Sequence, residues 1–197
     1  PARISAFCVN APINRPLHAA PNTAKTAQLS TVTKMPFSAT LLAASKFFSP
    51  KRRDKSALMP TAVPTDTAII FYPGAKVEAA AYLPLLNQLR QTGLTCILVE
   101  MPFRMAIFDV NAAEDVMAQF PEIRHWYLAG HSMGGAMASQ FAAGHRDQVD
   151  GLILLGAYLY GEYPSADTLT VYGSLNQSVE DKIDYTEHVV EIDGGNH

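Results

Sequence analysis

Residues 128–135 read LAGHSMGG, in which Ser132 lies among glycines directly after an apolar run. The preceding segment, HWYLAG at 125–130, is typical of a buried strand, and the small-residue segment MGGAMASQFAAGH at 133–145 is typical of a helix. A strand, a tight turn and a helix are the context in which the pattern G-x-S-x-G holds a reactive serine. The stretch therefore predicts that Ser132 is a nucleophile on a sharp turn.

The residues around Ser132 fit the geometry of such a turn. Gly130 and Gly134 lack the side chains that would collide where the nucleophile adopts a strained backbone conformation. A helix that begins at Met133 points its dipole and the Met133 backbone N–H at charge developing on a substrate oxygen. We expect His131, inside the turn, to pack rather than react.

From Thr67 onward, short β-rich runs alternate with helical patterns. This alternation predicts an α/β fold with a mostly parallel sheet, helices on both of its faces and connections too short for a large lid. The expected strands are 67–72, 95–101, 126–130, 151–158, 169–173 and 188–192, and the expected helices are about 77–91, 110–119, 133–143 and 178–186. Neither G-x-G-x-x-G nor G-x-x-x-x-G-K-[ST] occurs, which argues against a nucleotide-binding fold.

The first part of the chain has a different composition. From Pro1 to Arg53 there is no Asp or Glu, and the basic residues stand in a background rich in Ala, Ser, Thr and Pro. This composition is typical of an organellar transit peptide, and a disordered or mistranslated leader is the alternative. We place a leader at 1–60 and a domain at 61–197, so that the location is plastid or mitochondrion if the leader is genuine and cytoplasm otherwise.

Composition also limits the classes of partner. With 197 residues, 48% hydrophobic and 17% charged, the chain fits one soluble globular domain. A net charge of -3 and the lack of a basic stripe argue against nucleic acid, and no apolar run reaches the roughly 18 residues of a membrane span. Cys8 and Cys96 are far apart, so we predict two thiols rather than a disulfide, with Cys96 buried, and no metal site.

Four blocks of the chain together resemble the α/β-hydrolase family, specifically its small lidless members with a Y-P-G-G oxyanion turn and a G-H-S-x-G-G nucleophile elbow. The blocks, which occur in the order typical of that family, are FYPGAKVEAAAYLPLLNQL (71–89), VEMPFRMAIFD (99–109), LAGHSMGGAMAS (128–139) and IDGGNH (192–197). The resemblance covers Thr67–His197 and implies an α/β-hydrolase fold that needs no metal or organic cofactor.

The resemblance also implies roles for individual residues. The backbone N–H of Ala75, which follows the turn at Gly74, would form an oxyanion hole with that of Met133. His197 follows a strand and a Gly-Gly turn, where the family has the general base that takes the serine proton. Ala75 stands where relatives usually carry a second glycine, and its methyl group fits if φ is negative there.

The acid of the catalytic triad is the main departure from the family. Family members generally have G-x-x-D-G at this point, whereas GSLNQS at 173–178 puts Asn176 at the acid position. An amide can bond an imidazole but cannot stabilise an imidazolium. Three readings stay open: Glu162, in AYLYGEY after the preceding strand, supplies the carboxylate, Asn176 serves in a slower Ser-His-Asn arrangement, or the fold has lost catalysis.

The sequence thus predicts a serine hydrolase that forms an acyl-enzyme on Ser132 and acts on small-molecule carboxylic esters, with thioesters as the second substrate class. The competing hypothesis is a catalytically weakened or inactive α/β-hydrolase-fold protein that binds a ligand or a partner. Relatives continue past the histidine into another helix, so we expect either a fragment or a last strand with an open outer face. Substrate preference and oligomeric state are not predicted.

Overall fold

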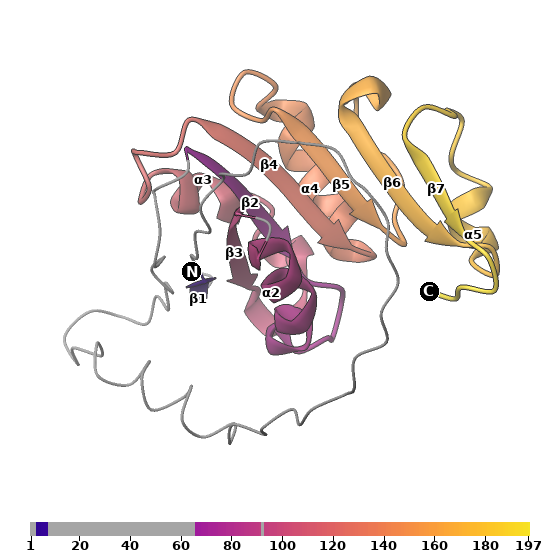
Figure 1. The fold of residues 1–197 in the computed structure, drawn as a ribbon, viewed down its shortest axis with the longest axis horizontal. Helices are drawn as coiled ribbons and strands as arrows, with labels where there is room; N and C mark the ends of the chain where they lie inside the picture. The colour runs from indigo at the N-terminus through magenta and orange to yellow at the C-terminus, as the bar shows by residue number, and fades with distance from the viewer. Residues whose placement is uncertain (1–2, 8–65, 92) are drawn as a thin grey trace, which may run out of the picture. The chain divides into compact units, whose positions relative to one another are not determined.

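The computed structural model describes residues 3–7, as backbone only, together with 66–91 and 93–197. Over these residues it contains one sheet of seven strands in the order β1-β3-β2-β4-β5-β6-β7 (Figure 1). The strands from β2 to β7 are parallel, and β1 pairs antiparallel with β3 at one edge. Their bounds are β1 Arg3–Phe7, β2 Thr67–Tyr72, β3 Thr95–Glu100, β4 His125–His131, β5 Gly151–Leu155, β6 Thr168–Gly173 and β7 Val189–Ile192.

β2 and β3 are buried along nearly their whole length, as expected for strands of a parallel sheet whose two faces are covered by helices. Ala68, Ile70 and Tyr72 of β2 point to the face that α3 and α4 cover. Ile69 and Phe71, the alternate residues, point to the other face, where Leu86 of α2 packs. The predicted α/β class, with a parallel sheet and helices on both faces, is confirmed.

Short helical elements connect the strands. Their bounds are η1 Ala79–Tyr82, α2 Leu83–Gln91, η2 Pro102–Arg104, η3 Ala106–Phe108, α3 Ala112–Met117, α4 Met133–Gly144, η4 Ser165–Asp167 and α5 Gln177–Glu180. Between β5 and β6 lie residues 156–167, whose only helical element in the described structure is η4. No large lid is inserted there.

Two predicted elements end at least three residues earlier than expected. The strand expected at 151–158 ends at Leu155, because Gly156 turns the chain with a φ of 54°. The helix expected at 178–186 ends at Glu180. Beyond it the chain runs to Tyr185, whose hydroxyl lies 2.7 Å from Thr170 Oγ1 of β6, so a tertiary contact replaces further helical turns.

The segment Arg3–Phe7 falls within the leader that the sequence predicts, yet its backbone pairs with β3 from Arg3↔Glu100 to Phe7↔Cys96. This part of the leader therefore belongs to the sheet. Residues 8–65, which include the rest of the leader and the expected boundary near Pro60, lie outside the described residues. The transit-like character of that segment stays a prediction.

The register between β2 and β4 places the turns that follow these two strands next to each other. β2 and β4 are neighbours, with Tyr72 opposite Gly130, so the turns that follow these two strands emerge side by side. The Tyr72 hydroxyl donates to Val110 O at 2.9 Å and accepts from Ala113 N at 2.8 Å, which fixes the end of β2 against α3. In open parallel sheets, the carboxyl ends of the strands are where ligands bind.

Candidate active site

Ser132 occupies the turn between β4 and α4, with φ 54° and ψ −125°. A non-glycine residue in this sparsely populated region costs about 1–3 kcal/mol and persists only where the surrounding structure enforces it. The Ser132 N–H donates to Leu155 O at 3.0 Å, and Ser132 O accepts from Ala136 N at 3.1 Å. These bonds to β5 and α4 hold the serine in its strained conformation.

The glycines around Ser132 permit very close backbone packing. A Cβ added to Gly130 would lie 2.5 Å from Gly134 C and from Gly135 N. A Cβ on Gly134 would collide with the carbonyl oxygens of Tyr72 and Pro73. The first turn of α4 therefore lies directly against the end of β2.

In the turn after β2, the Ala75 backbone N–H has no acceptor among the described residues. Within residues 66–91 and 93–197, Gly74 N bonds Tyr82 Oη at 3.0 Å and Lys76 N bonds Arg104 O at 2.7 Å, while no hydrogen bond involves Ala75 N. The positive φ of this turn, 62°, falls on Lys76 rather than on Ala75, so the Ala75 methyl group is accommodated.

Met133 supplies a second such donor at the first position of α4, since a helix leaves its first N–H groups without intrahelical partners. Its N–H likewise has no acceptor among the described residues. Because Gly134 contacts the carbonyl groups of Tyr72 and Pro73, the Met133 N–H and the turn containing Ala75 are neighbours. Such a pair of donors can bind a developing oxyanion.

His197 lies against the serine. Its Nε2 is 2.7 Å from Ser132 Oγ, the distance that a general base requires. The loop that carries His197 is fixed to the segment after β6: Leu175 N donates to Gly195 O at 2.9 Å and Ser174 N donates to Ile192 O at 3.0 Å. Backbone bonds thus position a histidine whose own side chain is exposed.

Asn176 lies on the other side of the His197 ring. It is buried, with 5% of its surface exposed, and its Nδ2 is 2.8 Å from His197 Nδ1. Ser178 Oγ donates to Asn176 Oδ1 at 2.8 Å. The structure therefore brings together Ser132, His197 and Asn176, in a chain that Ser178 extends.

The tautomer of His197 depends on which end of the Asn176 amide faces Nδ1. With Nδ2 facing Nδ1, a neutral ring carries its proton on Nε2 and donates to Ser132 Oγ. A general base requires the opposite tautomer, with an unprotonated Nε2. Rotation of the amide by 180° presents Oδ1 to Nδ1–H, with Ser178 Oγ then accepting from Nδ2.

Glu162 is not brought to this cluster. Its side chain is 98% exposed and pairs with Arg146, whose guanidinium also donates to the Glu162 carbonyl. His197 Nδ1 is instead in contact with Asn176. The geometry thus favours Asn176 over Glu162 as the partner of the histidine.

The sequence did not indicate a role for Tyr82 or Ser178, and it assigned His131 to packing. Tyr82 Oη lies 2.8 Å from His131 Nδ1, and the rings of His131 and His197 have centroids 5.2 Å apart. Burial lowers the pKa of His131 below its ordinary value, and the charge of His197 lowers it further. No spacing in the sequence connects Tyr82 of η1 with His131 of β4, because they meet through a tertiary contact.

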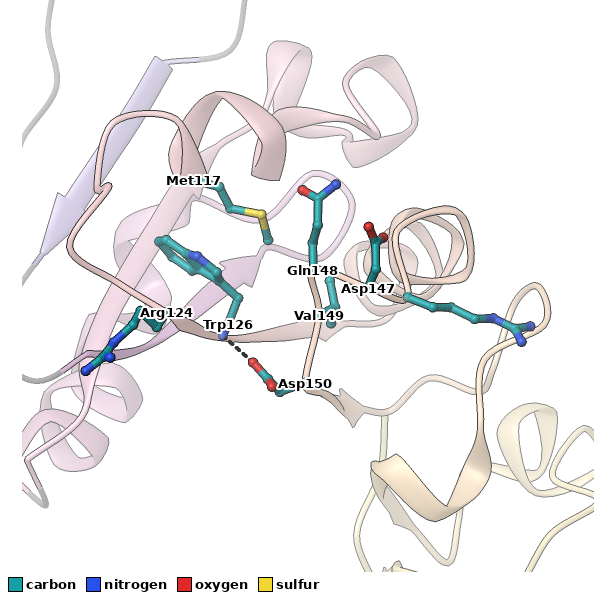
Figure 2. Close-up of a pocket in the computed structure, with 8 residues that line it drawn as sticks. Met117, Arg124, Trp126, Asp147, Gln148, Val149 and Asp150 are labelled. Atoms are coloured by element: carbon teal, nitrogen blue, oxygen red, sulfur yellow. Dashed lines mark hydrogen bonds between the residues drawn. The ribbon is translucent and has the colours of Figure 1, made fainter.

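A separate hollow of about 290 Å³ lies at the amino ends of β4 and β5, the edge of the sheet opposite Ser132 (Figure 2). Trp126 N donates to Asp150 Oδ2 at 2.8 Å beside it. Its arginines are already paired, Arg124 with Asp66 at 2.8 Å and Arg146 with Glu162. We assign it no ligand.

Among the described residues, no group of three or more His, Cys, Asp or Glu side chains is arranged to hold a metal ion. In the same part of the chain, none of the helices combines the length and the apolar character needed to cross a membrane. Cys96 is buried, as predicted.

Comparison with known proteins identifies the family. The sequence model of the alpha/beta hydrolase family matches residues 68–197, which is more than half of the chain. The protein belongs to the alpha/beta hydrolase family. Among curated proteins it is similar to a putative non-heme haloperoxidase of Mycobacterium phage D29, with 29% identity over 104 residues that make up 48% of this chain and 37% of that protein. The match thus spans little more than a third of that relative.

Solved structures agree on the fold. The chain is similar to a carboxylesterase structure from the thaumarchaeon Nitrososphaera gargenis, with TM-score 0.53, 10% identity and coverage of 66% of this chain and 83% of that one. For the monoacylglycerol lipase of Paleococcus ferrophilus, the TM-score is 0.54 and the identity 11%, with coverage of 69% and 88%. At these identities the likeness shows an alpha/beta hydrolase fold and nothing finer.

Proposed function

We propose that the chain is a serine hydrolase that cleaves small carboxylic esters through an acyl-enzyme on Ser132. The observation that carries the proposal is the 2.7 Å contact between Ser132 Oγ and His197 Nε2, at a residue with strained backbone dihedrals. Strain at a single serine is a feature of functional sites, because the surrounding structure must stabilise it. The esterase and lipase structures with the same fold are consistent with this substrate class.

In the proposed reaction, Ser132 Oγ attacks the ester carbonyl carbon while His197 Nε2 takes its proton. The backbone N–H groups of Ala75 and Met133 donate to the resulting oxyanion. Collapse of the tetrahedral intermediate breaks the bond to the leaving alcohol, which receives the proton from His197. Water then attacks the acyl-enzyme with His197 as base, releasing the acid and restoring Ser132.

Two exposed aromatic side chains, Phe103 and Phe108, form an apolar rim near the proposed oxyanion turn. This rim favours an ester with a short alkyl or aryl group as the substrate. Phe103 is 84% exposed and Phe108 is 60% exposed, and their rings pack with centroids 5.6 Å apart. The neighbouring Arg104 carbonyl accepts from Lys76 N, next to Ala75, so this rim is joined to the proposed oxyanion turn. We propose that it contacts the apolar part of the substrate.

A fluorophosphonate probe, which reacts covalently with activated serines, tests the proposal. Wild-type protein is expected to label at Ser132, and Ser132→Ala is expected not to label. The matched control is Ser165→Ala on η4, which should label as wild type does. Labelling of wild type no stronger than that of Ser132→Ala would refute the hydrolase proposal.

A second candidate function is a weakened or inactive hydrolase fold that binds a ligand or partner. One specific observation favours it, the amide of Asn176 facing His197 Nδ1 in the place of a carboxylate. An amide does not stabilise the imidazolium that forms during acylation. Weak but Ser132-dependent turnover of p-nitrophenyl acetate would support a slow enzyme, and its complete absence would support a binding role.

A further inference from the structure

A second hydrogen-bonded chain lies beside the Ser132–His197 pair. The Gly74 N–H donates to Tyr82 Oη at 3.0 Å, and Tyr82 Oη lies 2.8 Å from His131 Nδ1. Burial raises the pKa of Tyr82, so the phenol keeps its proton at neutral pH, and burial lowers the pKa of His131, so the ring stays neutral. The phenol oxygen accepts from Gly74 N–H, and the phenol O–H donates to Nδ1 in the His131 tautomer that carries its proton on Nε2.

The three groups are packed without spare room. A Cβ on Gly74 would lie 2.6 Å from His131 Nδ1 and 2.9 Å from Tyr82 Oη, so a side chain here would displace one or both of these rings. The Tyr82 ring also packs against Phe71 of β2, with centroids 4.8 Å apart. The phenol is thus held between the strand that precedes the turn and the histidine that precedes Ser132.

These hydrogen bonds fix the Pro73–Gly74 peptide group, which precedes the one that carries the Ala75 N–H. The next N–H, that of Ala75, is left without an acceptor, and the following one is held by the bond from Lys76 N to Arg104 O at 2.7 Å. The open N–H therefore stands between two fixed peptide groups. An oxyanion donor must be held in place before the reaction, because its contribution depends on preorganised geometry.

We propose that Tyr82 and His131 are a positioning pair that holds the Ala75 N–H in place for the oxyanion. The inference rests on the proposed hydrolase function and concerns residues that touch neither the ester carbonyl nor the proton in transit. The pair joins the turn after β2 to the turn after β4, so the two oxyanion donors keep a fixed separation.

The test uses Tyr82→Phe, which removes only the hydroxyl. Loss of an oxyanion donor costs about 10²–10³ in turnover, so a donor that is loosened rather than lost should lower kcat by about tenfold. KM for p-nitrophenyl acetate should stay within about twofold, because the substrate carbonyl gains its charge only in the transition state. The inhibition constant of a trifluoromethyl ketone, which forms an oxyanion adduct, should rise by the same factor as kcat/KM falls.

The matched control is Tyr163→Phe, which removes a buried hydroxyl that donates to Val149 O at 2.9 Å. This control should lose stability to a similar extent but keep kcat. The double variant Tyr82→Phe with His131→Asn should be no slower than the slower of its single variants, because residues acting as one unit are not additive.

The outcomes separate this inference from the function on which it rests. Labelling of wild type no stronger than that of Ser132→Ala overturns both. If wild type labels and Tyr82→Phe retains wild-type kcat, or if Tyr163→Phe loses as much kcat, the positioning pair alone is refuted. A loss in kcat with unchanged KM, specific to Tyr82→Phe, supports it.

Discussion

The amide nitrogen of Asn176 lies 2.8 Å from His197 Nδ1, at the position where related hydrolases are expected to present a carboxylate. The contact satisfies hydrogen bonding at both groups. It also leaves the charge that His197 acquires in the proposed reaction without a countercharge at Nδ1.

Replacing this amide by a carboxylate should accelerate the reaction. Asn176→Asp would accept a hydrogen bond from Nδ1–H, select the reactive tautomer and stabilise the imidazolium. We expect kcat for p-nitrophenyl acetate to rise at least tenfold, toward the roughly 10⁴-fold effect of the reverse exchange in a serine protease. Asn111→Asp, an exposed control without a side-chain cap bond, should leave kcat unchanged. No change in Asn176→Asp would show that the amide does not limit turnover.

Ser178 should influence the same step through the orientation of the amide. Its hydroxyl donates to Asn176 Oδ1 while Nδ2 faces His197, and it can accept from Nδ2 after the amide rotates. Ser178→Ala removes this partner from both orientations of the amide, which should change the fraction of His197 that carries its proton on Nδ1. Nitrogen-15 NMR of the imidazole measures that fraction, and a tautomer ratio equal to that of wild type would contradict this role.

The glycines of the Ser132 turn should tolerate substitution much less well than Gly144 at the end of α4. Gly130→Ala would place a methyl group 2.5 Å from the backbone of Gly134 and Gly135, so we expect a loss of several kcal/mol in the free energy of unfolding. Gly144→Ala, at the end of α4, meets nothing within 4 Å and should be neutral or stabilising by about 0.4–1 kcal/mol. Urea unfolding followed by circular dichroism compares the two.

The lowered pKa of His131 predicts a stability that depends on pH. The unfolded chain binds a proton at this histidine more readily than the folded protein, so stability is full above the ordinary pKa of 6.5 and is lost as pH falls through the lower folded value. The urea midpoint of wild type should fall between pH 7.5 and pH 5. In His131→Asn the fall should be smaller, and an equal fall in both proteins would show that other groups account for it.

The exposed rim should set the preference for the acyl group. Phe103→Ser removes most of the apolar surface of this rim and should lower kcat/KM for p-nitrophenyl butyrate several-fold more than for the acetate. Tyr160→Ser removes a ring that is 49% exposed on another loop and should change neither value. Equal losses for both esters in Phe103→Ser would exclude contact with the acyl chain.

The sequence predicts the positions of the parallel strands closely, because strands that are buried on both faces have nearly continuous apolar sequences. TAIIFY at 67–72 matches β2 at both ends, and the helix expected from Met133 begins there. The helix expected at 178–186 is shorter in the structure, because local helix propensity carries no information about the tertiary hydrogen bond between Tyr185 and Thr170. The strand Arg3–Phe7 was missed because its pairing partner β3 lies some ninety residues further along the chain.

Sequence motifs predicted only part of the candidate site. Ser132, His197 and Asn176 lie in recognisable blocks, and the structure brings them together. Tyr82, His131 and Ser178 enter through tertiary contacts, for which the sequence has no periodic signal. Glu162 was a reasonable alternative by strand order, but its side chain is 98% exposed and pairs with Arg146.

The pairing of Tyr72 with Gly130 has a consequence for how the site comes into being. The two proposed oxyanion donors lie just past the ends of β2 and β4, so their separation is inherited from the ladder between these strands rather than from either loop alone. A slip of one residue in that ladder would move one donor along the strand axis by about 3.3 Å. It would also turn the side chains of the shifted strand to the opposite face of the sheet. Covalent labelling of Ser132 during refolding would therefore report when this ladder has reached its native register.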